Sequence, residues 1–92
     1  MLYPFMTLDD NTEIVHSEAV IENGVEHVRV CIEKPVFEGF HSAECLLPEY
    51  IWSKVEGFTP SEINEYQSII ADMAHIIIRL ARTGGFDHAS GF

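Results

Sequence analysis

The dipeptide Asn23-Gly24 constrains this sequence most, because it is the preferred centre of a two-residue type I′ β-hairpin turn. Both central positions of that turn need a positive φ, which Asn and Gly adopt more readily than other residues. The segments 12–22 and 25–34 on either side are rich in Val, Ile and Thr, as strands are. The sequence therefore predicts one antiparallel hairpin across residues 12–34.

A two-residue loop also fixes the register of the two strands, since Glu22 then faces Val25. Counting outward from this pair predicts a core-facing set of cross-strand partners: Ala19 with Val28, Ser17 with Val30, and Val15 with Ile32. The opposite face then holds Val20 with His27, Glu18 with Arg29, and His16 with Cys31. A surface ion pair between Glu18 and Arg29 would contribute at most about 1 kcal/mol.

Further strands are expected before and after this hairpin. The segment 2–8 is apolar and ends at a turn over 9–11. Pro35 is expected to end the strand 25–34, because proline cannot donate to a ladder of hydrogen bonds. The segment 40–47 alternates as a strand whose inner face would carry Ala43, Cys45 and Leu47. The segment 48–55 is predicted to form one or two turns of helix.

The run Thr59-Pro60-Ser61-Glu62 is typical of a helix start. Thr59 suits the N-cap, Pro60 suits the first helical position, and Glu62 completes a capping box. We expect a long helix over 60–82 that stops at Gly84-Gly85.

Apolar residues recur on this helix at the spacing of one buried stripe. The predicted stripe consists of Ile63, Tyr66, Ile70, Met73, Ile77 and Leu80. Three more isoleucines lie outside it and form what we call the helix strip: Ile69, Ile76 and Ile78. An exposed apolar strip on so small a chain favours association, so we expect a homodimer with contacts through the helix strip, a two-fold dimer being the commonest form. The alternatives are that the N-terminal segment or residues 84–92 of the same chain cover the helix strip, or that another protein does.

Together these elements predict a single α+β domain over residues 1–92. Its fold class is an antiparallel β-meander of three to four strands, packed on one long C-terminal α-helix, with a short helical turn before that helix.

The net charge of the chain limits the classes of partner that it is expected to bind. Fifteen Asp and Glu residues face five Lys and Arg, which gives a formal net charge of −10. Direct binding to nucleic acid or to an anionic membrane is not expected, because both depend on basic residues. The first ten residues lack the basic region of a signal peptide, and two cysteines are too few for a disulfide framework. We therefore expect a cytoplasmic protein with reduced thiols.

Glutamates are spread along the predicted strands and could serve a basic partner. Alternate residues on a strand lie about 6.6–7 Å apart, which resembles the spacing of phosphates along a nucleic acid. The residues expected to contact such a partner are Glu18, Glu22, Glu26, Glu33 and Glu44. The sequence thus favours a non-enzymatic acidic binding module of the inhibitor, antitoxin or nucleic-acid-mimic type. The alternative interpretation is acidity that serves only solubility.

Several side-chain pairs could carry chemistry, but none forms a complete site. In the predicted register His16, His27 and Cys31 share a face, yet Arg29 lies between the last two and disfavours a cation. His41 and Cys45 are spaced as a minimal thiol nucleophile, without a sign of an oxyanion hole. We predict no catalytic residue, metal site or cofactor.

A second hypothesis is a small enzyme or ligand-binding protein. Its pocket would lie between the sheet and the helix, near His41, Trp52 and Tyr66. Several convergent polar groups in a deep pocket would distinguish it from a binding module.

Overall fold

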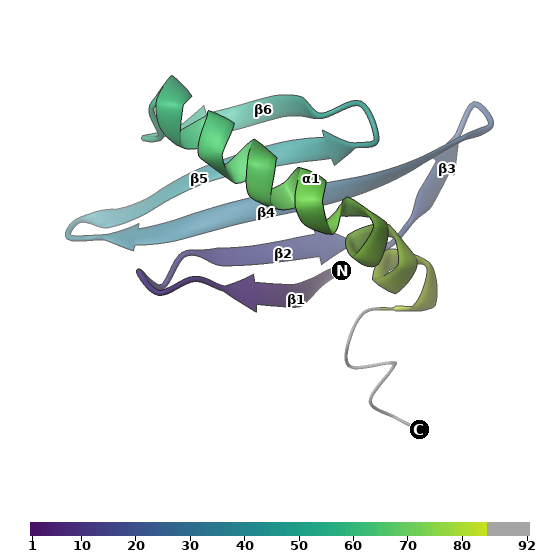
Figure 1. Cartoon of the computed structure of the whole chain (residues 1–92), viewed down its shortest axis with the longest axis horizontal. Coiled ribbons are helices and arrows are strands. Elements are labelled where there is room, and N and C mark those ends of the chain that lie inside the picture. Colours follow the sequence, from purple (N-terminus) through teal and green to yellow (C-terminus); the bar gives the residue numbers. More distant parts are fainter. Residues whose placement is uncertain (85–92) are drawn as a thin grey trace.

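The computed structural model describes residues 1–84 and shows an antiparallel sheet with one C-terminal helix (Figure 1). The α+β class is confirmed, but the sheet has six strands and not three or four. The elements are β1 (Leu2–Thr7), β2 (Glu13–Ser17), β3 (Val20–Glu22), β4 (Val25–Val36), β5 (Gly39–Leu47), β6 (Ile51–Glu56) and α1 (Pro60–Thr83).

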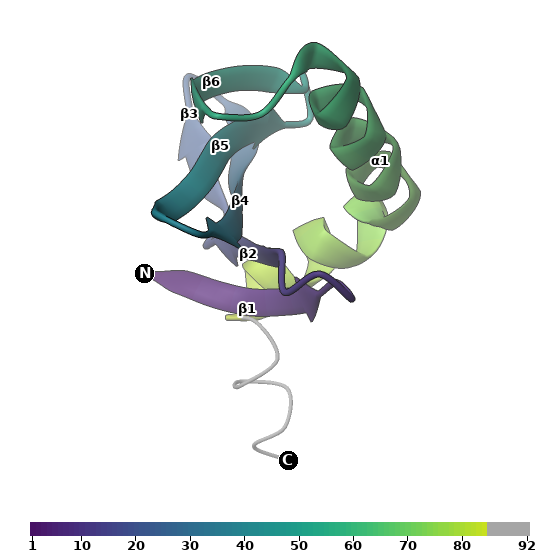
Figure 2. The same cartoon turned by 90° about the vertical axis from the view of Figure 1, so that its left-hand side faces the viewer.

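The strands follow one another as a meander in the order β1-β2-β4-β5-β6, and β3 pairs only with β4. The sheet curves, and α1 crosses the concave side of the curve (Figure 2). The other side of the sheet faces away from α1, and we call it the outer face.

The predicted hairpin is confirmed next to its turn. Val20 pairs with His27, and Glu22 pairs with Val25. Asn23 has a φ of 52° and Gly24 a φ of 80°, as a type I′ turn requires. Local turn chemistry therefore fixes the pairing of β3 with β4.

Beyond β3 the register shifts by one residue, so the predicted pairing there is wrong. Val20 pairs with His27 and His16 with Val30, which leaves the three residues 17–19 opposite the two residues 28–29. The Ser17 hydroxyl accepts a hydrogen bond from the Arg29 backbone N–H at 2.9 Å and satisfies a donor that the ladder leaves free. One extra residue of this kind turns every preceding side chain to the other side of the sheet.

The shift exchanges the faces of β2. His16, predicted to lie outside, is completely buried in the core, whereas Val15 lies opposite Cys31 on the outer face. The predicted ion pair between Glu18 and Arg29 does not form. Glu18 instead accepts a hydrogen bond from the Tyr3 hydroxyl at 3.4 Å.

The β4–β5 hairpin agrees with the sequence on its inner side. Ala43, Cys45 and Leu47 are all buried, as predicted. However, β4 continues past its expected end to Val36, and Pro35 pairs with Phe40. Since β2 no longer pairs with β4 beyond Glu33, the missing N–H of Pro35 is tolerated there.

The short helical turn predicted for 48–55 is wrong, because this segment contains β6. Trp52 pairs with Cys45, so β6 covers the second edge of β5. Tyr50 and Lys54 have φ values of 59° and 51°, which are incompatible with a right-handed helix. Pairing with β5 satisfies the backbone of this segment better than an isolated turn of helix would.

The helix prediction is confirmed at the start and along its buried side. Thr59 is the N-cap, and its backbone N–H donates to the Glu62 carboxylate at 2.9 Å while Glu62 N–H donates to the Thr59 hydroxyl. Gly84 caps the other end with a φ of 90°; Gly85 lies outside the described residues. Ile70 and Ile77 are completely buried against the sheet.

The core lies between α1 and the concave side of the sheet. Its buried members include Ile14, Val28, Val30, Ile32, Ala43, Cys45, Leu47, Phe58, Tyr66, Ile70, Ile77 and Ala81. Within residues 1–84, no helix is both long enough and apolar enough to cross a membrane.

Candidate functional site

Four carboxylates gather on the outer face of the sheet. Partners across antiparallel strands point to the same side, and one such row runs Thr7, Glu13, Glu33, Ser42, Glu56 from β1 to β6. The next row brings Glu44 beside Cys31. We call the set Glu13, Glu33, Glu44 and Glu56 the outer acidic face.

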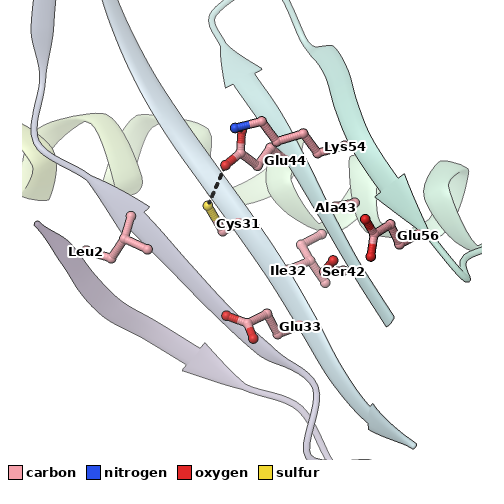
Figure 3. Close-up of a pocket in the computed structure, with 9 residues that line it drawn as sticks. All are labelled: Leu2, Cys31, Ile32, Glu33, Ser42, Ala43, Glu44, Lys54 and Glu56. Carbon is pink, nitrogen blue, oxygen red and sulfur yellow. Dashed lines mark hydrogen bonds and ion pairs between the residues drawn. The ribbon is translucent and has the colours of Figure 1, made fainter. Parts of the chain in front are cut away.

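A shallow hollow of about 420 Å³ lies on this face, and Figure 3 shows the side chains around it. Glu33, Glu44 and Glu56 line it together with Leu2, Cys31 and Ser42. Lys54 also lines it, and its ammonium lies 3.6 Å from the Glu44 carboxylate. One of the carboxylates therefore already has a cation.

Glu13 and Glu33 lie directly opposite each other on β2 and β4. Cβ atoms of such partners are about 4.5–5.5 Å apart, and like charges in this position destabilise a sheet. Among residues 1–84, neither carboxylate forms an ion pair with a basic side chain. Lys34, the next residue after Glu33, instead approaches Asp10 at 3.5 Å. Within residues 1–84, two adjacent carboxylates are thus held together without a basic side chain that neutralises them.

The Cys31 thiol lies on this face and is a poor nucleophile. Burial and the neighbouring Glu44 carboxylate raise the pKa of Cys31 to about 11, and its thiol lies 3.9 Å from a Glu44 oxygen. Burial alone raises the pKa of Cys45 to about 11. Since the thiolate is the nucleophile, neither cysteine is activated for catalysis, and Cys45 belongs to the core.

The structure separates the five glutamates predicted to contact a partner. Only Glu33 and Glu44 lie on the outer acidic face. Glu26 accepts two hydrogen bonds from the Arg82 guanidinium, at 2.8 and 2.6 Å, and these bonds hold its pKa below the usual value. Glu22 lies next to the hairpin turn, and Glu18 lies 3.9 Å from the N-terminal amine.

Sequence reasoning did not select Glu13 and Glu56, which complete the face. Continuing the unshifted register puts Glu13 opposite Lys34 and not opposite Glu33. Glu56 follows the segment 48–55 that was predicted as a helical turn. Along β4 the outward residues are Glu33, Cys31, Arg29 and His27, so β4 carries no run of carboxylates at phosphate-like spacing. Glu13 and Glu33 are instead direct partners on neighbouring strands, which lie about 4.7–4.9 Å apart, while Ser42 lies between Glu33 and Glu56 in the same row.

The histidines do not meet Cys31. His16 lies on the core side, where its Nδ1–H donates to the Ser17 carbonyl at 2.8 Å and its ring lies against Tyr3. His27 is 3.1 Å from the Glu49 carboxylate. Within the described part of the chain, no three His, Cys, Asp or Glu side chains are arranged to hold a metal ion.

The residues of the alternative pocket fill the space between sheet and helix. The rings of His41 and Phe58 pack edge to face with their centroids 5.6 Å apart. The rings of Phe58 and Tyr66 pack in the same way, with a centroid distance of 5.1 Å. Trp52 donates from its indole N–H to the side chain of Gln67 at 2.8 Å. These contacts join β5, β6 and α1 and do not place several polar groups around a shared cavity.

The helix strip is half-buried at Ile69, Ile76 and Ile78. Ile69 and Ile78 pack against the core of the same chain. Part of the apolar surface that was expected to drive association is therefore covered within one copy, and the homodimer stays a prediction.

The chain was compared with known proteins at three levels. No protein-family model, no curated protein and no solved structure matches it. The function is therefore inferred from the geometry of the outer face.

Proposed function

We propose that the protein is a non-enzymatic binding module whose outer acidic face binds a basic protein partner. The observation that supports this most is that Glu13 and Glu33 lie opposite each other and form no ion pair with a basic side chain of the described residues 1–84. A positive side chain placed between them would replace a repulsion by two attractions. This gain in electrostatic energy exists only in the complex. The arrangement therefore favours binding while it lowers the stability of the free protein.

The whole charge of the chain supports the same partner chemistry. A formal net charge of −10 on 92 residues attracts basic surfaces at long range and accelerates their encounter. Such attraction is screened over about 8 Å at physiological ionic strength. The association rate should therefore fall as salt increases, while the dissociation rate should depend more on the close contacts at the face.

The chemistry of the site also favours binding over catalysis. The one thiol of the outer face, Cys31, keeps its proton at neutral pH because its pKa is about 11. The hollow beside it is open and shallow. An inhibitor or antitoxin would use adjacent carboxylates of this face to bind individual basic side chains of its partner. A nucleic-acid mimic would use all the carboxylates of the same face together.

The test compares two variants of equal charge. The first removes the outer acidic face by the substitutions E13Q, E33Q, E44Q and E56Q. The control removes four exposed carboxylates elsewhere by D9N, E22Q, E65Q and D72N. Each variant has a formal charge of −6, since four negative charges are removed from −10.

Wild type and both variants are used as bait in lysate of the source cells, and captured proteins are identified by mass spectrometry. The captured partner is then purified and titrated at low and high salt. We expect the face variant to lose the partner and the control to retain it with a moderately slower association. Equal losses in the two variants would show that net charge alone attracts the partner and would contradict the assignment to this face.

A further inference from the structure

A second hollow adjoins the outer acidic face at the β4–β5 end of the sheet. It measures about 520 Å³ and is lined by Thr7, Asn11, Glu13, Glu33, Pro35 and Phe40. Pro35 follows Glu33 by two residues on β4, so both side chains lie on the same side of the sheet. Phe40 of β5 is the cross-strand partner of Pro35 and therefore lies on that side as well. The two unneutralised carboxylates and an aromatic ring thus share one surface depression.

Phe40 is exposed to solvent, with 64% of the residue's surface accessible. An exposed aromatic face attracts cations, and arginine uses such faces more often than lysine does. The guanidinium group is planar, stacks on rings and presents parallel N–H donors to carboxylates. The lysine ammonium is a compact, strongly hydrated charge without this flat surface. The hollow therefore combines the two features that distinguish an arginine from a lysine.

We infer that this hollow is an arginine-binding site for the basic partner. The guanidinium stacks on Phe40 and donates hydrogen bonds to the carboxylates of Glu13 and Glu33. The inference rests on the proposed function and makes it more specific, because it names the residue type on the partner that the face selects. A partner that presents an exposed arginine should be preferred to one that presents a lysine in the same position.

The probes are two acetylated peptides of eight residues, one of alternating Gly and Arg and one of alternating Gly and Lys. They carry the same charge, and their affinities for the full chain are measured by isothermal titration calorimetry at low salt. We expect the arginine peptide to bind about two- to fivefold more tightly, which is the ratio that a cation–π contact at an exposed site provides.

Substitutions assign the difference to the hollow. F40L should abolish the preference for arginine and leave the affinity for the lysine peptide unchanged. F37L is the matched control, because Phe37 is a fully exposed aromatic residue of the same hairpin that does not line the hollow. The pair E13Q and E33Q should weaken both peptides. Thermal melting of each variant checks that it is folded.

Three results separate this inference from the proposed function. Selective loss of arginine binding in F40L, with F37L unaffected, supports the inference. Equal affinities for the two peptides, or equal effects of F40L and F37L, overturn the arginine site while a loss in E13Q/E33Q still supports an acidic binding face. If neither peptide responds to E13Q/E33Q, both proposals are wrong.

Discussion

Gly57, between β6 and α1, offers the sharpest quantitative test of the packing. It has a φ of 88°, which residues other than glycine adopt at a cost. A Cβ atom at this position would lie 2.5 Å from Cγ and 2.7 Å from Nε2 of His41. Because the His41 ring lies edge to face against Phe58, it cannot move away without losing that contact. The substitution G57A therefore imposes both backbone strain and a steric clash.

The magnitude follows from two separate costs. The left-handed backbone costs an alanine about 1–2 kcal/mol. Overpacking against the imidazole adds about 1–3 kcal/mol. Gly24 supplies the matched control, since its φ is 80° and a Cβ there would meet nothing within 4 Å. We therefore expect G24A to show only the backbone cost and G57A to be destabilised by about 1–3 kcal/mol more.

Urea unfolding followed by circular dichroism gives the free energy of unfolding of each variant. In thermal melts each kcal/mol should lower Tm by about 4–8 °C for a domain of this size. In the background of H41A, where the ring is absent, G57A should cost no more than G24A. Equal destabilisation of G24A and G57A in the wild-type background would refute the described packing of His41 on Gly57.

The remaining predictions concern the helix, acid stability, the thiols and association. I70D should unfold the domain because it buries an unpaired charge, whereas E65A should change the free energy of unfolding by less than about 0.5 kcal/mol; equal melting of the two would mean that α1 is wrongly oriented. Hydrogen bonds from Thr59 hold the pKa of Glu62 below its ordinary value of 4.5, so its stabilising contribution is complete above that pH and is lost as pH falls through the lowered pKa. E62Q should therefore reduce the loss of stability between about pH 5 and pH 2 in urea titrations, and an unchanged acid slope would exclude this role. Cys31 and Cys45 should not react with a disulfide reagent at about pH 8 in the folded protein but should react in urea; rapid labelling of the native chain would contradict their burial. Sedimentation equilibrium should show a dimer of the 10.4 kDa chain at micromolar concentration, increasingly so at high salt, and a monomer at both salts would refute association through the helix strip.

The features that the sequence predicts correctly are determined by neighbouring residues. Asn23-Gly24 adopts its turn because of its own backbone preferences, and the strands next to it pair as expected. The cap at Thr59 is equally local, since donor and acceptor lie three residues apart. Alternation along β5 places Cys45 in the core, because β5 keeps one register with β4 over its whole length.

The features that the sequence does not reveal depend on distant contacts. The shift between β3 and β2 is stabilised by the Ser17 hydroxyl and the Arg29 backbone, which are twelve residues apart. That one displacement places His16 in the core and Glu13 opposite Glu33. The outer acidic face therefore becomes visible only when the register is known.

Strand β6 was missed for a different reason. A short segment of mixed apolar and polar residues, such as Ile51–Glu56, fits a helical turn and a strand about equally well. The free edge of β5 decides between the two structures, because β6 pairs with that edge in antiparallel orientation. This pairing adds Glu56 to the outer acidic face, so the same error concealed one of its four carboxylates.

The most direct test of the account is to locate the binding surface on the folded protein. Amide chemical shifts of the ¹⁵N-labelled chain are followed in NMR spectra while the arginine peptide, and then the captured partner, are added. We predict that the largest changes cluster on the outer face, at Glu13, Glu33, Glu44 and Phe40, and that those of the helix strip remain small. Changes centred on α1 or on the β3–β4 turn, with the outer face unaffected, would contradict the assignment of function to this face.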